Sequence, residues 1–233
     1  MATRKRIPEI SFPDSTDDTT ATILGQNILF IGIHYDQSPA NPCKEWDGFG
    51  EIRSLSHRHI DSIDRDEAVA LIKSDPDVIP LSYFEHGNSL WMVKDLPAPA
   101  GVEFEWDGVR FAGIWIPDRC VRESYMGQDG LSRRDWMVQQ AKSACTTYTQ
   151  WANGEVYGYI VDVYKARKGD FGDVVTDHDY YDHHTPIEED SCWGYYGWED
   201  ALGETTRVVK STLKTLGYSR RAIAAALKET VAA

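Results

Sequence analysis

Residues 57–61 read H-R-H-I-D, so two imidazoles and a carboxylate occupy alternate positions. On a strand, alternate residues share one face, which would allow His57, His59 and Asp61 to hold one ion together. Imidazole nitrogen and carboxylate oxygen are the ligands with which catalytic zinc sites activate water. The stretch therefore offers a divalent metal such as zinc, and with it a metal-dependent hydrolase or nuclease, as one interpretation of the chain.

This stretch resembles the H-x-H-x-D-H motif of the metallo-β-lactamase fold, but Ser62 stands where the last histidine of that motif would be. The repeated β–α pattern of that fold is also missing. An exposed polar strand edge accounts for the same residues and is favoured over a hydrolase. A second cluster, D-H-D-Y-Y-D-H-H at 177–184, could bind a divalent ion, although an acidic loop with incidental histidines explains it more simply.

Cys192 is a weak candidate for a nucleophile. A thiolate needs a nearby base or positive charge, and the acids at 188–190 disfavour the anion instead. A buried structural cysteine beside Trp193 fits this environment better. The chain has no G-x-S-x-G, Walker or G-x-G-x-x-G pattern. The sequence therefore leans away from an enzyme, and we expect no cofactor.

The charge of the chain is concentrated in one segment. The formal net charge is −13, and between Gly169 and Thr206 there is no Lys or Arg. Such a segment repels nucleic acid and attracts a basic protein surface, so we expect no direct nucleic-acid binding. A solvated acidic loop without a partner is the alternative.

The composition is that of a globular chain. It has 233 residues, of which 42% are hydrophobic, and no apolar run reaches the about 20 residues of a membrane span. The basic start lacks the apolar region of a signal peptide, and the four cysteines form no C-x-x-C pair. We therefore expect a cytoplasmic protein without a membrane partner.

Hydrophobic patterns predict strands in the first half and helices in the second, hence an α+β fold with a mostly antiparallel sheet, packed helices and a helical C-terminus. The clearest elements are a buried strand over 27–35 and a helix over 132–152 with Ser132 as its cap. Helices are also expected over 65–74 and 199–216. We expect a flexible arm over 1–25, a core domain over 26–200 with an acidic loop over 167–190, and a helical hairpin over 201–233.

Five segments resemble a family of uncharacterised small proteins carried by bacteriophages and other mobile elements. They are D-Q-S-P-A-N-P-C-K-E-W-D-G-F-G (36–50), L-S-Y-F-E-H-G-N-S-L (81–90), W-D-G-V-R-F-A-G-I-W-I-P (106–117), Y-T-Q-W-A-N-G-E-V-Y-G-Y (148–159) and D-S-C-W-G-Y-Y-G (190–197). The resemblance implies a phage origin and action inside an infected bacterial host. It implies no reaction and no catalytic residues.

The combined expectation is a phage accessory protein that inhibits a host defence or nucleic-acid-handling protein, as DNA mimics do, through an acidic and aromatic surface. A homodimer is also possible on the sequence alone. A sponge for a signalling nucleotide, with tryptophans stacking on the base and Arg53, Arg58, Arg119 or Arg122 on the phosphate, is a further alternative. The expected partner-binding residues are Glu45, Trp46, Asp47, His86, Asp177, Asp179, Tyr180, Tyr181, Asp182, Glu188, Glu189, Asp190, Trp193, Tyr195 and Trp198.

Overall fold

The computed structural model describes residues 7–59, 61–97, 99, 107–127 and 130–228. The chain has the predicted α+β fold, with antiparallel sheets and a helical C-terminus. It forms two compact units: unit 1 comprises Met1–Ser38 and Val156–Ala233, and unit 2 is Pro39–Glu155. Unit 2 is therefore inserted into the chain of unit 1.

Unit 1 contains a four-stranded antiparallel sheet in the order β1-β2-β7-β8. The central strands β2 and β7 pair from Asn27↔Lys165 to Tyr35↔Tyr157, across the insertion of unit 2. The strands are β1 (Thr19–Leu24), β2 (Asn27–Tyr35), β7 (Val156–Lys165) and β8 (Glu188–Tyr196). Since β8 pairs only with β7, it is an edge strand of this sheet.

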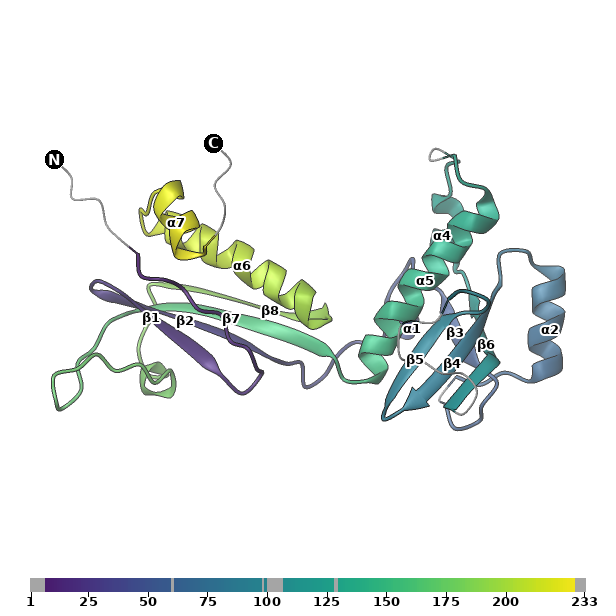
Figure 1. Ribbon diagram of the computed structural model, residues 1–233, viewed down its shortest axis with the longest axis horizontal. Helices are drawn as coiled ribbons and strands as arrows, with labels where there is room; N and C mark the ends of the chain where they lie inside the picture. The colour runs from purple at the N-terminus through teal and green to yellow at the C-terminus, as the bar shows by residue number, and fades with distance from the viewer. Residues whose placement is uncertain (1–6, 60, 98, 100–106, 128–129, 229–233) are drawn as a thin grey trace. The chain divides into compact units, whose positions relative to one another are not determined.

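The two faces of the unit 1 sheet are covered differently. Helices α6 (Trp198–Thr215) and α7 (Arg220–Ala226) lie over one face, where Leu29, Ile31 and Val161 are fully buried (Figure 1). Segment 166–187 covers part of the opposite face and includes a short 3₁₀ helix, η1 (Asp179–Tyr181). The alternation of β2 thus gives apolar residues to both faces, which explains its continuous apolar run.

Unit 2 contains a second antiparallel sheet in the order β3-β6-β4-β5, with helices against both faces. Met137 and Ala141 of α5 pack with Trp115 on one face, and Ala68 of α2 packs with Ile114 on the other. The elements are α1 (Pro42–Glu45), β3 (Glu51–Ser54), α2 (Arg65–Ser74), β4 (Ile79–His86), β5 (Asn88–Val93), β6 (Gly108–Ile116), α4 (Arg119–Ser124) and α5 (Arg133–Ala152).

A network of ion pairs holds the turn that precedes β4. Asp77 is 5% exposed, and its carboxylate accepts from Nε of Arg133 at 2.9 Å and from Nη1 of Arg122 at 3.1 Å. Arg122 also donates from Nη2 to Asp75 at 2.8 Å. These hydrogen bonds to arginine hold the pKa of both carboxyl groups below their usual range. The turn is therefore tied to α4 and to the start of α5.

The predicted cap of α5 is confirmed, and α7 is capped in the same way. Oγ of Ser132 accepts the backbone N–H of Asp135 at 3.1 Å, and Oγ of Ser219 accepts that of Ala222 at 3.3 Å. None of the described helices has an apolar stretch long enough to span a bilayer.

The expected division of the chain differs from the observed units. Residues 19–24, which were expected to belong to a flexible arm over 1–25, form strand β1 instead. The threonines of T-T-A-T-I-L favour a half-exposed strand once β2 lies beside them. The single core expected over 26–200 is split between two sheets, each with its own buried core. Strand β8 takes up the last residues of the expected acidic loop over 167–190.

Candidate functional site

Segment 166–187 is fastened to the sheet of unit 1 by Tyr181. The side chain of Tyr181 is fully buried, and its ring lies 5.3 Å from that of Phe30 and 5.1 Å from that of Tyr164. Its hydroxyl donates to Val175 O at 3.1 Å and accepts from Arg167 N at 3.0 Å. The expectation that Tyr181 is an exposed contact residue is therefore wrong: it is the anchor of the segment.

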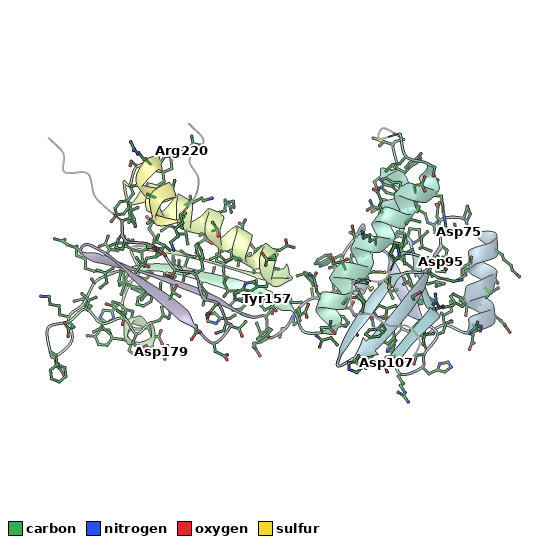
Figure 2. All side chains as sticks on the ribbon, viewed as in Figure 1. Asp75, Asp95, Asp107, Tyr157, Asp179 and Arg220 are labelled. Atoms are coloured by element: carbon green, nitrogen blue, oxygen red, sulfur yellow. The ribbon has the colours of Figure 1, made fainter. Side chains whose placement is uncertain are left out.

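The acids next to this anchor point into solvent. Asp177, Asp179 and Asp182 are exposed, as is Tyr180, 47% of whose surface is accessible. Asp179 lies on the side of the sheet opposite Arg220 of α7 (Figure 2). Burial of Tyr181 thus presents these carboxylates on the face that the helices leave open.

Strand β8 continues the acidic region along the edge of the sheet. It pairs Asp162 with Glu189 and Val161 with Asp190, so Glu189 and Asp190 point to opposite faces. Both are exposed all the same, because residues 189–194 form an unbroken exposed run. Asp190 also accepts a hydrogen bond from the Tyr159 hydroxyl at 2.7 Å. The strand therefore projects acids on both sides of its edge.

The loop acids and the strand acids lie close together. Burial raises the pKa of Tyr164, and the carboxylates of Asp162, Asp182 and Glu189 raise it further. The pKa of this one phenol is thus raised by carboxylates from β7, from the loop and from β8. We call the following set the acidic surface: Asp177, Asp179, Asp182, Glu188, Glu189 and Asp190. None of its members forms a salt bridge with Lys or Arg in the described part of the chain.

Trp193 gives this edge an apolar face. Its indole lies over Gly158 of the neighbouring strand, where a Cβ atom would be only 2.1 Å from the ring, and 46% of the side chain is exposed. Gly158 therefore allows the ring to lie against the sheet. Trp198 packs edge-on against Tyr157 and Tyr195 packs against the helix-side core, so both are half buried and contribute less surface than expected.

Cys192 is exposed, so the expectation of a buried structural cysteine is wrong. The residue faces the helical side of the sheet, but the edge position of β8 leaves it accessible. Its Sγ lies 3.8 Å from the carbonyl oxygen of Trp193. No base or cation within reach of this thiol is described, and it remains flanked by carboxylates.

His178 makes the attachment of the loop sensitive to pH. Its Nε2 lies 3.1 Å from Oδ2 of Asp162, and its ring packs edge-on against Phe30. The bond to Asp162, aided by the charges of Asp182 and Asp179, raises the pKa of His178 against the opposing effect of burial. The protonated imidazole is thus favoured in the folded chain.

The stabilising contribution of His178 should accordingly fall as the pH rises. Because the folded-state pKa is raised, the contribution is fully present below the unfolded-state pKa of about 6.5 and is lost as the pH passes through the folded-state value. A charge-assisted hydrogen bond contributes about 1.5–3 kcal/mol. We expect His178→Gln to lower the free energy of unfolding at pH 5.5 and to have a smaller effect at pH 8.5, measured by urea titration. An equal loss at both pH values would contradict this account.

The residues of the predicted metal site do not come together. Residues 57–59 lie beyond the end of β3 rather than on a strand. His59 turns to the aromatic rings of Tyr83 and Trp91, while Asp61 pairs with Lys44 at 3.4 Å and lines a different hollow. In the described residues, ligand-type atoms of three such side chains approach within 4.8 Å only at His178, Asp179 and Asp182. Exposed acids often lie this close without a cation, so we assign no metal here.

The remaining predicted contact residues belong to unit 2. Glu45 accepts the backbone N–H of Asn41 at 2.8 Å, and Trp46, 40% exposed, packs edge-on against Phe49. Asp47 is exposed, and Nδ1 of His86 lies 2.9 Å from Asp107. These four residues belong to unit 2, whereas the acidic surface is defined on unit 1.

A second concave region was not foreseen from the sequence. A hollow of 620 Å³ in unit 2 is lined by side chains from β4, β5 and the end of α5, together with Pro39 and the residues after β3. Three of the five segments quoted above, 36–50, 81–90 and 148–159, contribute to it. The sequence signal that could have located this hollow is the pair Tyr83 and Trp91, which face each other across β4 and β5.

Comparison with known proteins found no match: no family model, no curated protein and no solved structure corresponds to this chain.

Proposed function

We propose that the chain inhibits a host protein by placing the acidic surface of unit 1 in a basic groove of that protein. The observation that carries the proposal is a set of carboxylates on an edge strand and its neighbouring loop, exposed except for the half-buried Glu188, of which none forms a salt bridge with a described Lys or Arg. A surface of this kind resembles the charge pattern of a phosphate backbone, to which nucleic-acid-binding grooves respond. The resemblance of five segments to phage proteins supports a bacterial host as the source of the partner.

The shape of the edge suits a groove better than a flat surface. Because Glu189 and Asp190 project from opposite faces of β8, a partner that encloses the edge meets both, whereas a flat partner meets one. The half-exposed indole of Trp193 adds an aromatic contact of the type that dominates interface energies. Removing Trp193 should therefore weaken the complex without altering its dependence on salt.

The first experiment is an affinity capture from bacterial lysate at low and at high salt, followed by mass spectrometry. We expect one host protein to be retained at low salt and released at high salt, since exposed charge pairs are screened by ions. The matched test is a variant carrying Asp177→Asn, Asp179→Asn, Asp182→Asn, Glu188→Gln and Glu189→Gln. If each lost pair costs about 0.5 kcal/mol, affinity falls on the order of 50–100-fold.

A control variant makes the same change of charge in unit 2, at the exposed acids Asp64, Asp66, Glu67, Asp95 and Glu123. It should bind the captured protein nearly as well as the unaltered chain. Thermal unfolding separates lost binding from lost structure, because removing uncompensated negative charge should keep or raise the stability of unit 1. Equal binding by both variants and the unaltered chain would end the proposal.

A further inference from the structure

The hollow in unit 2 has the size and lining of a small-molecule site. Its volume of 620 Å³ falls within the about 300–1,000 Å³ of ligand pockets. The lining combines aromatic rings with a few polar groups, as in sites that fix both the position and the orientation of a ligand. The residues on which the inference rests are Arg58, His59, Tyr83, Glu85, Trp91 and Trp151.

The aromatic wall is held in place by its own contacts. The ring centroids of Tyr83 and Trp91 are 4.8 Å apart, and the imidazole of His59 lies 5.1 Å and 5.5 Å from them. Asn153 at the end of α5 exchanges three hydrogen bonds with Ser89 of β5, at 2.8, 2.9 and 3.0 Å. The end of α5 and the β4–β5 hairpin are thus joined, so the walls are organised without a ligand.

Three polar groups of different character meet in this hollow. Glu85 accepts the Tyr83 hydroxyl at 3.0 Å, which together with burial raises the pKa of Tyr83 to about 12. Nδ1 of His59 is bonded to Oγ of Ser54 at 2.8 Å, and its Nε2 has no hydrogen bond within the described residues. Arg58 is exposed and forms no ion pair with any described residue. The hollow therefore offers one anion, one open imidazole nitrogen and one cation.

We propose that this hollow binds an amino-purine mononucleotide. The half-buried rings of Tyr83 and Trp151 line the hollow and suit a planar base, since bases stack on aromatic side chains. The Glu85 carboxylate is an acceptor for the exocyclic amine, and the planar guanidinium of Arg58 matches a phosphate group. A single cation in an acidic protein favours a ligand with one phosphate over a polyphosphate.

The test is calorimetric titration of the full chain with AMP, adenosine, IMP, inorganic phosphate and cellobiose. AMP should bind more tightly than adenosine, which lacks the phosphate, and than IMP, which lacks the exocyclic amine. Phosphate alone and cellobiose should give no saturable heat. The proposal would be overturned if AMP at about 1 mM gave no binding. It would also be overturned if the chain bound cellobiose in preference to AMP.

Two variants assign the roles of the polar groups. Arg58→Ala should weaken AMP about tenfold and leave adenosine unchanged, because a charge-assisted contact is lost only for the phosphate. Glu85→Gln, whose amide oxygen can still accept the Tyr83 hydroxyl, should weaken AMP and adenosine alike, by about fivefold. Arg119→Ala, at an exposed arginine that does not line the hollow, is the control. AMP binding that is equal in all three variants would place the ligand elsewhere.

Discussion

Replacing Asp77 by alanine should lower the free energy of unfolding of unit 2 by about 3 kcal/mol. The carboxylate is almost inaccessible and pairs with both Arg122 and Arg133, so its removal leaves Arg122 with Asp75 alone and takes from Arg133 its ion-pair partner among the described residues. The arginines are partly exposed, at 30% and 44%, and water will compensate some of the loss. We therefore expect a loss of unfolding free energy at the low end of the range for breaking a buried ion pair.

Urea unfolding followed by tryptophan fluorescence measures this effect, because unit 2 contains Trp91 and Trp115 in its core. Asp77→Asn keeps the size and one acceptor of the side chain and should cost less than alanine. Asp75→Ala is the comparison for a carboxylate that is 30% exposed, that forms its ion pair with Arg122, and that also accepts the backbone N–H of Asp77. Equal, small losses for all three variants, below about 1 kcal/mol, would show that the network contributes little.

Replacing Tyr181 by alanine should cost about 3–4 kcal/mol and release segment 166–187 from the sheet. The ring is fully buried between Phe30 and Tyr164, and its hydroxyl satisfies backbone groups of Arg167 and Val175. No other described side chain of the segment is buried as completely. Loss of this anchor should therefore scatter the acids that lie beside it, with little effect on unit 2.

Hydrogen exchange provides the decisive measurement for this variant. Amides of 166–187 should lose protection in Tyr181→Ala while those of β2 and β7 keep it, which separates local release from global unfolding. Tyr181→Phe is the matched control: it retains the ring, loses the hydroxyl and should cost about 1–2 kcal/mol. If the alanine variant kept full protection of the segment, the anchoring role would be refuted. Partner capture by the same variant then reports whether the acidic surface must be ordered to bind.

Local patterns were sufficient to predict most elements of this fold. The apolar run of β2, the period of α5 and the caps Ser132 and Ser219 each act within a few residues, so the sequence contains their full signal. Strand β1 was missed because its alternate threonines look like a polar arm until β2 lies beside them. The division into two units was missed for a similar reason: strand pairing across residues 36–155 leaves no local trace.

The candidate sites divide along the same line. Composition located the acidic surface, since the absence of Lys and Arg over 170–205 is visible in the sequence. It could not tell Tyr180 from Tyr181, of which one is exposed and the other buried, because that depends on the rings of Phe30 and Tyr164. The hollow in unit 2 joins residues from Pro39 to Asn153, so only the assembled sheet brings them together.

The insertion of unit 2 between β2 and β7 has a consequence for how the chain reaches its native state. The two central strands of unit 1 form what is topologically a hairpin, and its connecting loop is an entire folded body. The free-energy cost of closing an unstructured loop rises by about 0.6 kcal/mol for each doubling of its length. If unit 2 folds first, it shortens the effective loop between β2 and β7, and the two strands find their register faster. A backbone hydrogen bond of 2.8 Å from Asp36 N to Val156 O lies where the chain leaves β2 and where it enters β7. Since the β2–β7 pairing runs to Tyr35↔Tyr157 at this end, we expect a short turn in place of residues 39–155 to leave the strand register of unit 1 unchanged.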